Sequence, residues 1–291
     1  MHTNFGASLR SLFTFSDSTG DYERLVNSEI FRLLPADLMR LLRDPLYAEE
    51  HSHLLVTTIP SPSDHTIAER KIASPFILEK ICKTVFEDRT DDIRTFYDTL
   101  RRGAEMNSAA GMFFEARVHQ VLREGGVINL FPISCVEENP AVNYVYSEYT
   151  EENPKRLVLP RSTEEVVSKA QTEAPVTGIY YRPVEKNFPA FDSWLCYQPT
   201  PEDDPIHLRF QMTLAMTHSV AKKGLECMDR LVPGKAVKFL VVVTEEGIRP
   251  KMYVPKDYID KKLGGGDPNT KFPVYHLPLT RDQIFSSLPR D

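Results

Sequence analysis

The sequence lacks the short motifs that identify several common enzyme classes. Its four cysteines form no CxxC pair and have no histidine at zinc-ligand spacing, so neither a zinc site nor a redox dithiol is expected. It also has no GxxxxGK(S/T) phosphate loop, no Rossmann glycine fingerprint and no nucleophile elbow. These absences leave ATP-driven, nicotinamide-dependent and serine-hydrolase chemistry without support, and an unrelated α/β enzyme stays as an alternative.

Long apolar runs are also missing. No stretch approaches the roughly 20 apolar residues that are needed to span a bilayer. Leu9, Leu12 and Phe15 are separated by polar residues and do not form a continuous signal segment. We therefore expect an intracellular protein, in the nucleus or the cytoplasm, with no membrane partner and with reduced thiols.

The chain has little excess of positive charge. Its formal net charge of −6 argues against a surface coated with basic residues, so any contact with nucleic acid must come from a local patch. Between Arg209 and Lys262 there are eleven Lys/Arg against six Asp/Glu, whereas Glu137 to Glu173 holds eight Glu against four Lys/Arg. We expect the first stretch to face phosphate. Within the second stretch, the residues from Lys155 to Glu173 are interpreted as an inserted, solvated excursion.

Residues 1–104 are predicted to form a mostly helical N-terminal region. Between Asp21 and Leu42, apolar residues recur at helical intervals and are interrupted by Pro35, which predicts a bent helical pair. We find no catalytic pattern in this region and expect it to serve packing, positioning or a protein partner. The other predicted elements are a short strand over His53–Ile59 and helices over Phe76–Phe86 and Asp91–Arg102.

Residues 105–291 are predicted to form one α/β domain. A helix is expected to begin near Asn107 or Ser108, run through Leu122 and stop at Gly125-Gly126. Helices and strands then alternate, which is an α/β order. The predicted strands are Val176–Tyr181, Leu208–Leu214 and Val237–Val243, and the predicted helices are Thr163–Gln171 and His218–Leu231.

Five polar residues of this domain are candidates for a functional site. On its helix Glu115 falls about 20° beyond the edge of an apolar arc, so its carboxylate borders the core. Asp192 stands between Phe191 and the single tryptophan, Trp194, where holding a divalent cation would explain a carboxylate. Each of these residues also has an ordinary structural interpretation, as a boundary glutamate or as a turn cap.

The remaining three candidates follow Asp192 at a strand-to-helix junction. Gln211 lies 19 residues after Asp192 and shares a strand face with Thr213. His218 and Lys222, four residues apart, are predicted to share one face of the next helix. Without the preceding carboxylates, this pattern would be read as a sheet edge followed by a solvated helix.

The order of these residues resembles the PD-(D/E)xK nuclease core. The stretches Tyr180–Pro183, Phe188–Trp194, Phe210–Thr213 and Lys222–Leu225, with His218, are similar to the C-terminal domain of Crinkler and retrotransposon-hot-spot-like proteins. The resemblance runs from about Gly111 to Val243. It implies a restriction-endonuclease-like mixed sheet flanked by helices, but the ATPase module that often precedes such domains is absent because the phosphate loop is missing.

The resemblance implies Mg²⁺- or Mn²⁺-dependent hydrolysis of phosphodiesters in nucleic acid, with DNA as the first expectation. Asp192 would be the main metal ligand, Gln211 a neutral oxygen ligand, and Glu115 would hold metal-bound water. Thr213 stands where the family has lysine and carries no charge. Lys222 from the next helix would replace that lysine, or His218 would carry the proton. A catalytically inactive effector or interaction module of the same fold is the alternative.

Overall fold

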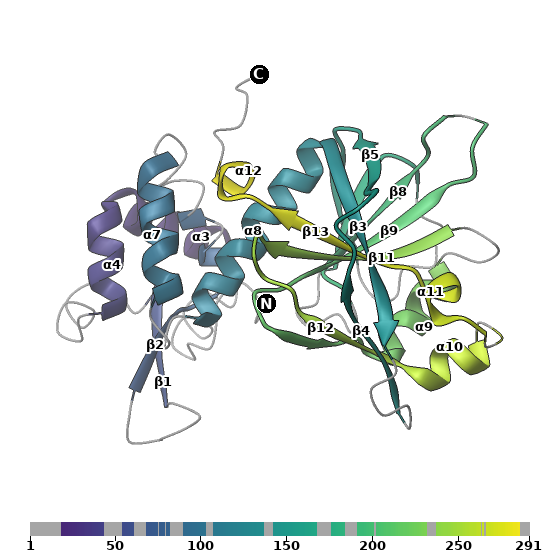
Figure 1. Cartoon of the computed structure of the whole chain (residues 1–291). Helices are drawn as coiled ribbons and strands as arrows, with labels where there is room; N and C mark the ends of the chain where they lie inside the picture. Colours follow the sequence, from purple (N-terminus) through teal and green to yellow (C-terminus); the bar gives the residue numbers. More distant parts are fainter. Residues whose placement is uncertain are drawn as a thin grey trace. The chain divides into compact units, whose positions relative to one another are not determined.

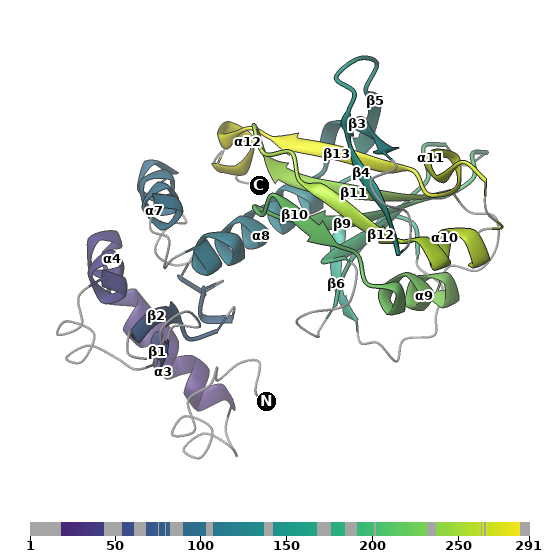
Figure 2. The same ribbon diagram turned by 60° about the horizontal axis from the view of Figure 1, so that its bottom comes forward.

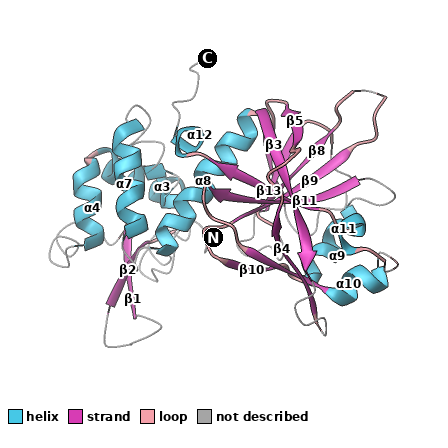
Figure 3. Ribbon diagram, viewed as in Figure 1, coloured by secondary structure: helices cyan, strands magenta, loops and turns pink. Residues whose placement is uncertain are grey.

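The computed structural model divides the chain into two compact units, one of residues 1–116 with 285–291 and one of residues 117–284 (Figures 1 and 3). The boundary falls inside a helix, whereas the sequence placed it at residues 104 and 105. The residues described are 19–43, 54–60, 68–74, 76–78, 80–81, 90–102, 107–136, 142–167, 176–183, 191–200, 202–231, 237–262, 264 and 266–285.

The first unit combines helices with a small hairpin. Helix α3 (Thr19–Phe31) buries Tyr22, Val26 and Ile30, which lie on one face at intervals of four residues. Pro35 begins α4 (Pro35–Arg43), so the predicted bent pair is confirmed. The unit also holds the antiparallel pair β1 (Val56–Pro60) and β2 (Ala68–Ile72), helix α7 (Thr90–Arg102) and the start of α8 (Asn107–Glu124).

The second unit is built on one mixed sheet of 11 strands. Ten strands follow the order β10-β12-β4-β3-β13-β11-β9-β8-β7-β6, and β5 pairs with the far end of β3. Its strands are β3 (Gly126–Val136), β4 (Asn143–Tyr149), β5 (Lys155–Leu159), β6 (Thr163–Val167), β7 (Ile179–Pro183), β8 (Ser193–Tyr197), β9 (Ile206–Met212), β10 (Thr217–Ser219), β11 (Val237–Glu245), β12 (Lys251–Pro255) and β13 (Val274–Leu279). Its helices besides α8 are α9 (Lys222–Leu231), α10 (Lys256–Lys262), α11 (Pro268–Lys271) and α12 (Arg281–Phe285).

The connection between β9 and β10 shows that the sheet is strongly curved. Six steps of about 4.8 Å would separate these two strands by about 29 Å in a flat sheet. The chain from Met212 to Thr217 spans at most about 18 Å. The sheet therefore curls until β10 comes back toward the end of β9, and its concave face encloses a core.

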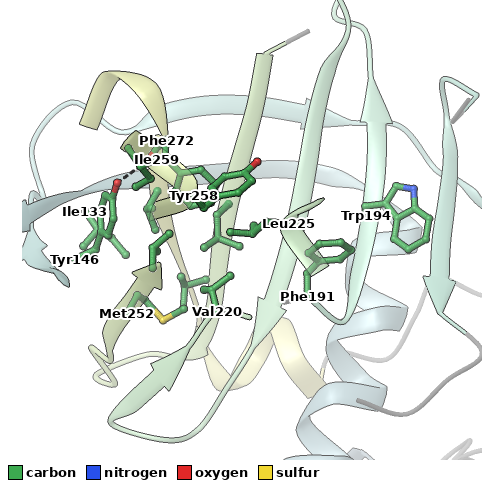
Figure 4. Close-up of a cluster of buried hydrophobic side chains, with 14 of the residues drawn as sticks. Ile133, Tyr146, Phe191, Trp194, Val220, Leu225, Met252, Tyr258, Ile259 and Phe272 are labelled. Carbon is green, nitrogen blue, oxygen red and sulfur yellow. Dashed lines mark hydrogen bonds between the residues drawn. The ribbon is translucent and has the colours of Figure 1, made fainter. Parts of the chain in front are cut away.

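Buried side chains from both ends of the sheet meet in this core. Met252 of β12 and Val220, just after β10, belong to the same cluster as Trp194 of β8 and Leu240 of β11 (Figure 4). Helices α9 and α10 lie side by side and close the cluster with Leu225, Tyr258 and Ile259 (Figure 2). Because the sheet is curved, strands that precede α9 in the chain and strands that follow it bury side chains in the same core.

The opposite face of β7 and β8 packs on the second half of α8. Tyr180 of β7 is fully buried, and its hydroxyl donates to Ser193 Oγ at 2.6 Å. The same hydroxyl is 2.7 Å from His119 Nδ1 of α8. Because Ser193 follows Asp192 directly, this buried chain of hydrogen bonds fixes the start of β8.

Helix α8 ends where glycine is required. Gly125 has a φ of 75°, and a Cβ there would lie 2.5 Å from the Leu159 carbonyl oxygen. We expect Gly125→Ala to lower the free energy of unfolding by more than about 1 kcal/mol, since the backbone conformation and the contact with β5 both oppose a side chain. Chemical denaturation measures this change.

Gly111 is the matched control within the same helix. A Cβ at Gly111 meets no atom within 4 Å, so Gly111→Ala should leave stability unchanged or raise it by up to about 1 kcal/mol. Equal losses of stability in the two variants would contradict the requirement for glycine at Gly125.

Several predicted elements are confirmed and others are wrong. The predicted strands correspond to β7, β9 and β11, and the predicted helix with its glycine stop corresponds to α8. The helix predicted over Thr163–Gln171 is wrong, since Thr163–Val167 is strand β6. The solvated excursion is also wrong in its described part, because β5 pairs with β3 and buries Leu157 and Leu159.

Candidate functional site

An acid and an amide meet where β8 begins and β9 ends. Gln211 Nε2 donates to Asp192 Oδ2 at 2.8 Å, and the Met212 backbone N–H donates to the same oxygen at 2.6 Å. Gln211 is buried and Asp192 is half-buried. The structure therefore brings together two of the predicted site residues that are 19 positions apart in the chain.

The antiparallel register of β8 and β9 explains this contact. Ser193 pairs with Phe210, and the Asp192 N–H donates to the Phe210 carbonyl at 2.8 Å, which extends the ladder by one residue. Phe191 is fully buried in the concave core, where Figure 4 shows it between Leu225 and Trp194. Asp192 is thus held between a buried aromatic residue and the end of a strand.

The spacing of the pair suits a cation with oxygen ligands. Adjacent ligands of Mg²⁺, at about 2.1 Å and a right angle, lie about 3 Å apart, and Asp192 Oδ2 is 2.8 Å from the Gln211 amide. A half-turn of the amide would present Oε1 beside the carboxylate. In the part of the chain that is described, no three His, Cys, Asp or Glu side chains gather as metal ligands. The pair would leave the other ligand positions to water and phosphate.

Thr213 completes the end of β9 without replacing the missing lysine. Its N–H donates to the Val243 carbonyl at 3.0 Å, and its Oγ1 accepts from the Ala215 N–H at 3.0 Å. The side chain is buried and turns the chain toward β10. It supplies no charge next to Asp192.

His218 lies on a strand and not on the predicted helix. It belongs to β10 and pairs with Met252, whose side chain is buried in the concave core. Directly paired residues point to the same face, so His218 faces the interior that also receives Gln211. Burial lowers the pKa of His218 below 6.5, so the ring is neutral at pH 7 and able to accept a proton.

Lys222 and His218 therefore do not share a helix face, which corrects the sequence-based arrangement. Lys222 is the first residue of α9, and its ammonium group contacts the Asp257 carboxylate of α10 and lies 3.9 Å from Glu226 Oε1. The ion pair with Asp257 raises the pKa of Lys222. The structure places this lysine in the contact between α9 and α10.

Glu115 lies on α8, as predicted, but in the first of the two units. Its side chain is exposed, whereas the neighbouring Phe113 and Phe114 are buried. The residues of the second unit that the structure brings together are Asp192 and Gln211.

The basic stretch from Arg209 to Lys262 is only partly available to a phosphate backbone. Arg209, the first residue of this stretch, is 1% exposed on β9, so the expectation that it contacts a nucleic-acid backbone is wrong. The exposed basic residues of this stretch within the described ranges are Lys223, Arg230, Arg249, Lys251 and Lys261. They lie on or next to α9, β12 and α10.

Two polar groups in this unit were missed at the sequence level. One is the chain His119–Tyr180–Ser193, and the other is the contact of Arg209 with Asp229, which comes from α9. The available signal was the alternation of His207, Arg209 and Gln211 along β9. Both faces of this strand are buried, so three alternating polar residues indicate a polar group inside the unit.

Models of known families, curated proteins and solved structures provide no match to this chain. Among the helices that the structure describes, none is both long and apolar enough to cross a membrane.

Proposed function

We propose that this chain carries a PD-(D/E)xK-type nuclease domain that hydrolyses phosphodiesters of DNA with Mg²⁺ or Mn²⁺ bound by Asp192 and Gln211. The observation that carries the proposal is the contact of these two side chains at the start of one strand and the end of its antiparallel neighbour. They stand between α8 and α9 in the chain, in the order helix, acid, amide and helix.

The residues of this chain have separate roles in the proposal. A bound divalent cation would neutralise phosphate charge and lower the pKa of a bound water. Asp192 would supply the anionic ligand and Gln211 a neutral one. His218, neutral and directed into the concave interior, takes the proton from the attacking water in place of the absent lysine.

The involvement of His218 predicts a specific pH dependence. Cleavage should rise with pH through the lowered pKa of His218 and become constant above about pH 6.5, because only the neutral ring accepts a proton. His218→Gln should remove this rise and reduce the rate at pH 7.5 by about a hundredfold. Initial rates of plasmid nicking across pH measure both effects.

Lys222→Met is the matched control for that experiment. Its ammonium group is already paired with Asp257 and Glu226, so the rate and the pH profile should both stay within about threefold of the unmodified chain. A larger loss in Lys222→Met than in His218→Gln would return the role of base to the lysine.

A second candidate function is a catalytically inactive module of the same fold that acts through binding. The observation in its favour is that Thr213 carries no charge and that Lys222 pairs with carboxylates of α9 and α10. Incubation of the chain with plasmid DNA and either Mg²⁺ or Mn²⁺ separates the candidates. Metal-dependent nicking supports the nuclease, and intact plasmid with both metals supports the binding module.

A further inference from the structure

A second group of polar residues lies on the concave face, beginning two residues before Gln211 on the same strand. His207 and Arg209 of β9 share this face with Gln211, because all three are two residues apart. Lys238 of β11 pairs directly with His207 and points the same way. Three nitrogen-bearing side chains thus converge on one region beneath α9.

Arg209 has one edge of its guanidinium group without a hydrogen bond. Its side chain is 1% exposed, and its Nε and Nη2 atoms are buried with no hydrogen-bond partner. These two nitrogens form the edge that binds a carboxylate or a phosphate through two parallel hydrogen bonds. The Nδ1 atom of His207, a buried residue, also has no hydrogen-bond partner.

The carboxylate of Asp229 is the acidic group next to both Lys238 and Arg209. Asp229 Oδ1 accepts from Lys238 Nζ at 3.0 Å, and Asp229 Oδ2 accepts from the Tyr258 hydroxyl at 2.8 Å. These bonds hold Asp229 Oδ1 3.8 Å from Arg209 Nη2, beyond hydrogen-bond distance. Two positive charges therefore face one negative charge in a largely buried place.

We propose that Arg209, His207 and Lys238 form an internal site for a small tetrahedral oxyanion of the phosphate class. The anion binds the Nε and Nη2 edge of Arg209 and balances the surplus positive charge. Buried donors without acceptors and a buried unbalanced charge both cost free energy, which a bound anion would recover. The Lys238 and Asp229 side chains keep 21% and 27% exposure, so solvent reaches the rim of the site.

The burial of the Arg209 edge favours the free ion over the end of a nucleotide. Arg209 interacts with Asp229 of α9 and with Tyr258 of α10. A ligand on its buried edge must therefore lie between these helices and the sheet. The site is separate from the Asp192–Gln211 pair and does not depend on nuclease activity.

Calorimetric titration of the intact chain with sodium phosphate, against sodium chloride at equal ionic strength, tests the proposal. We expect one phosphate to bind per chain and to raise the unfolding temperature. Arg209→Lys keeps the charge but loses the two-nitrogen edge, so the affinity should fall about tenfold or more. Equal responses of the unmodified chain to phosphate and chloride would overturn the proposal.

Three further measurements make the result specific. Lys223→Met removes an exposed lysine of α9 and should bind phosphate as the unmodified chain does. Lys238→Met, less buried than Arg209, should weaken phosphate binding and serves if Arg209→Lys does not fold. A nucleoside 5′-monophosphate should bind at least about tenfold more weakly than phosphate, because the enclosed edge excludes the sugar. Equal affinity for both, or no loss in Lys238→Met, would contradict an internal ion site.

Discussion

Replacing Asp192 with asparagine is expected to reduce metal-dependent cleavage of plasmid DNA by at least about a hundredfold. Asparagine has the same shape and can still accept the Met212 N–H, but it loses the negative charge that would hold the cation. Loss of a ligand that contributes several kcal/mol to charge stabilisation corresponds to two or more powers of ten in rate. Initial nicking rates at a fixed Mg²⁺ concentration measure the effect.

Asp257→Asn provides the same chemical change outside the proposed site. Asp257 pairs with Lys222 between α9 and α10, so this variant should cut within about threefold of the unmodified chain. Unfolding curves of both variants show whether a loss of rate reflects a loss of folded protein. A folded Asp192→Asn chain that cuts at the original rate would refute the assignment of Asp192 as metal ligand.

Replacing Asp229 with alanine is expected to produce a large loss of stability. The change leaves Arg209, which is 1% exposed, without its acidic partner, and removes the acceptor of Lys238 and of the Tyr258 hydroxyl. Breaking a buried ion pair by removing one partner costs about 3–5 kcal/mol. Urea denaturation, followed by the fluorescence of the single tryptophan, measures the free energy of unfolding of this unit.

Glu226→Ala tests whether this loss is specific to the buried group. Glu226 lies on the same helix, and its carboxylate is 3.9 Å from Lys222 near the surface, so a much smaller change is expected. Comparable losses in Asp229→Ala and Glu226→Ala would show that the effect comes from the helix and not from the charges beneath it.

Local sequence patterns predicted the elements that can be recognised from their own residues. Helix α8 has an apolar arc and a glycine stop, and both are readable without the rest of the fold. Strands β7 and β11 are short segments rich in apolar residues, and β9 alternates apolar and polar residues over a strand length. The resemblance to the PD-(D/E)xK core predicted a shared location for Asp192 and Gln211, and the β8–β9 register brings the two side chains into contact.

The errors arose where pairing with another strand decides the local structure. Thr163–Val167 contains two glutamates and a helical pattern was assigned to it, but β7 supplies the backbone partners that make it a strand. The sequence predicts His218 on a helix, but it pairs with β12 in strand β10, which ends three residues before α9 begins. Hydrogen bonds to another strand are not encoded in the residues of the segment itself, so local propensity could not predict either outcome.

The sequence by itself determined that the chain contains an α/β unit, where its long helix stops, and which acid and amide are candidates for one site. The tertiary structure decided which polar residues face that site. The curvature of the sheet turned His218 into the concave interior, and packing beneath α9 and α10 buried Arg209 with Asp229. Both results depend on the path of a sheet whose neighbouring strands are far apart in the chain, because pairing and burial are properties of the folded whole.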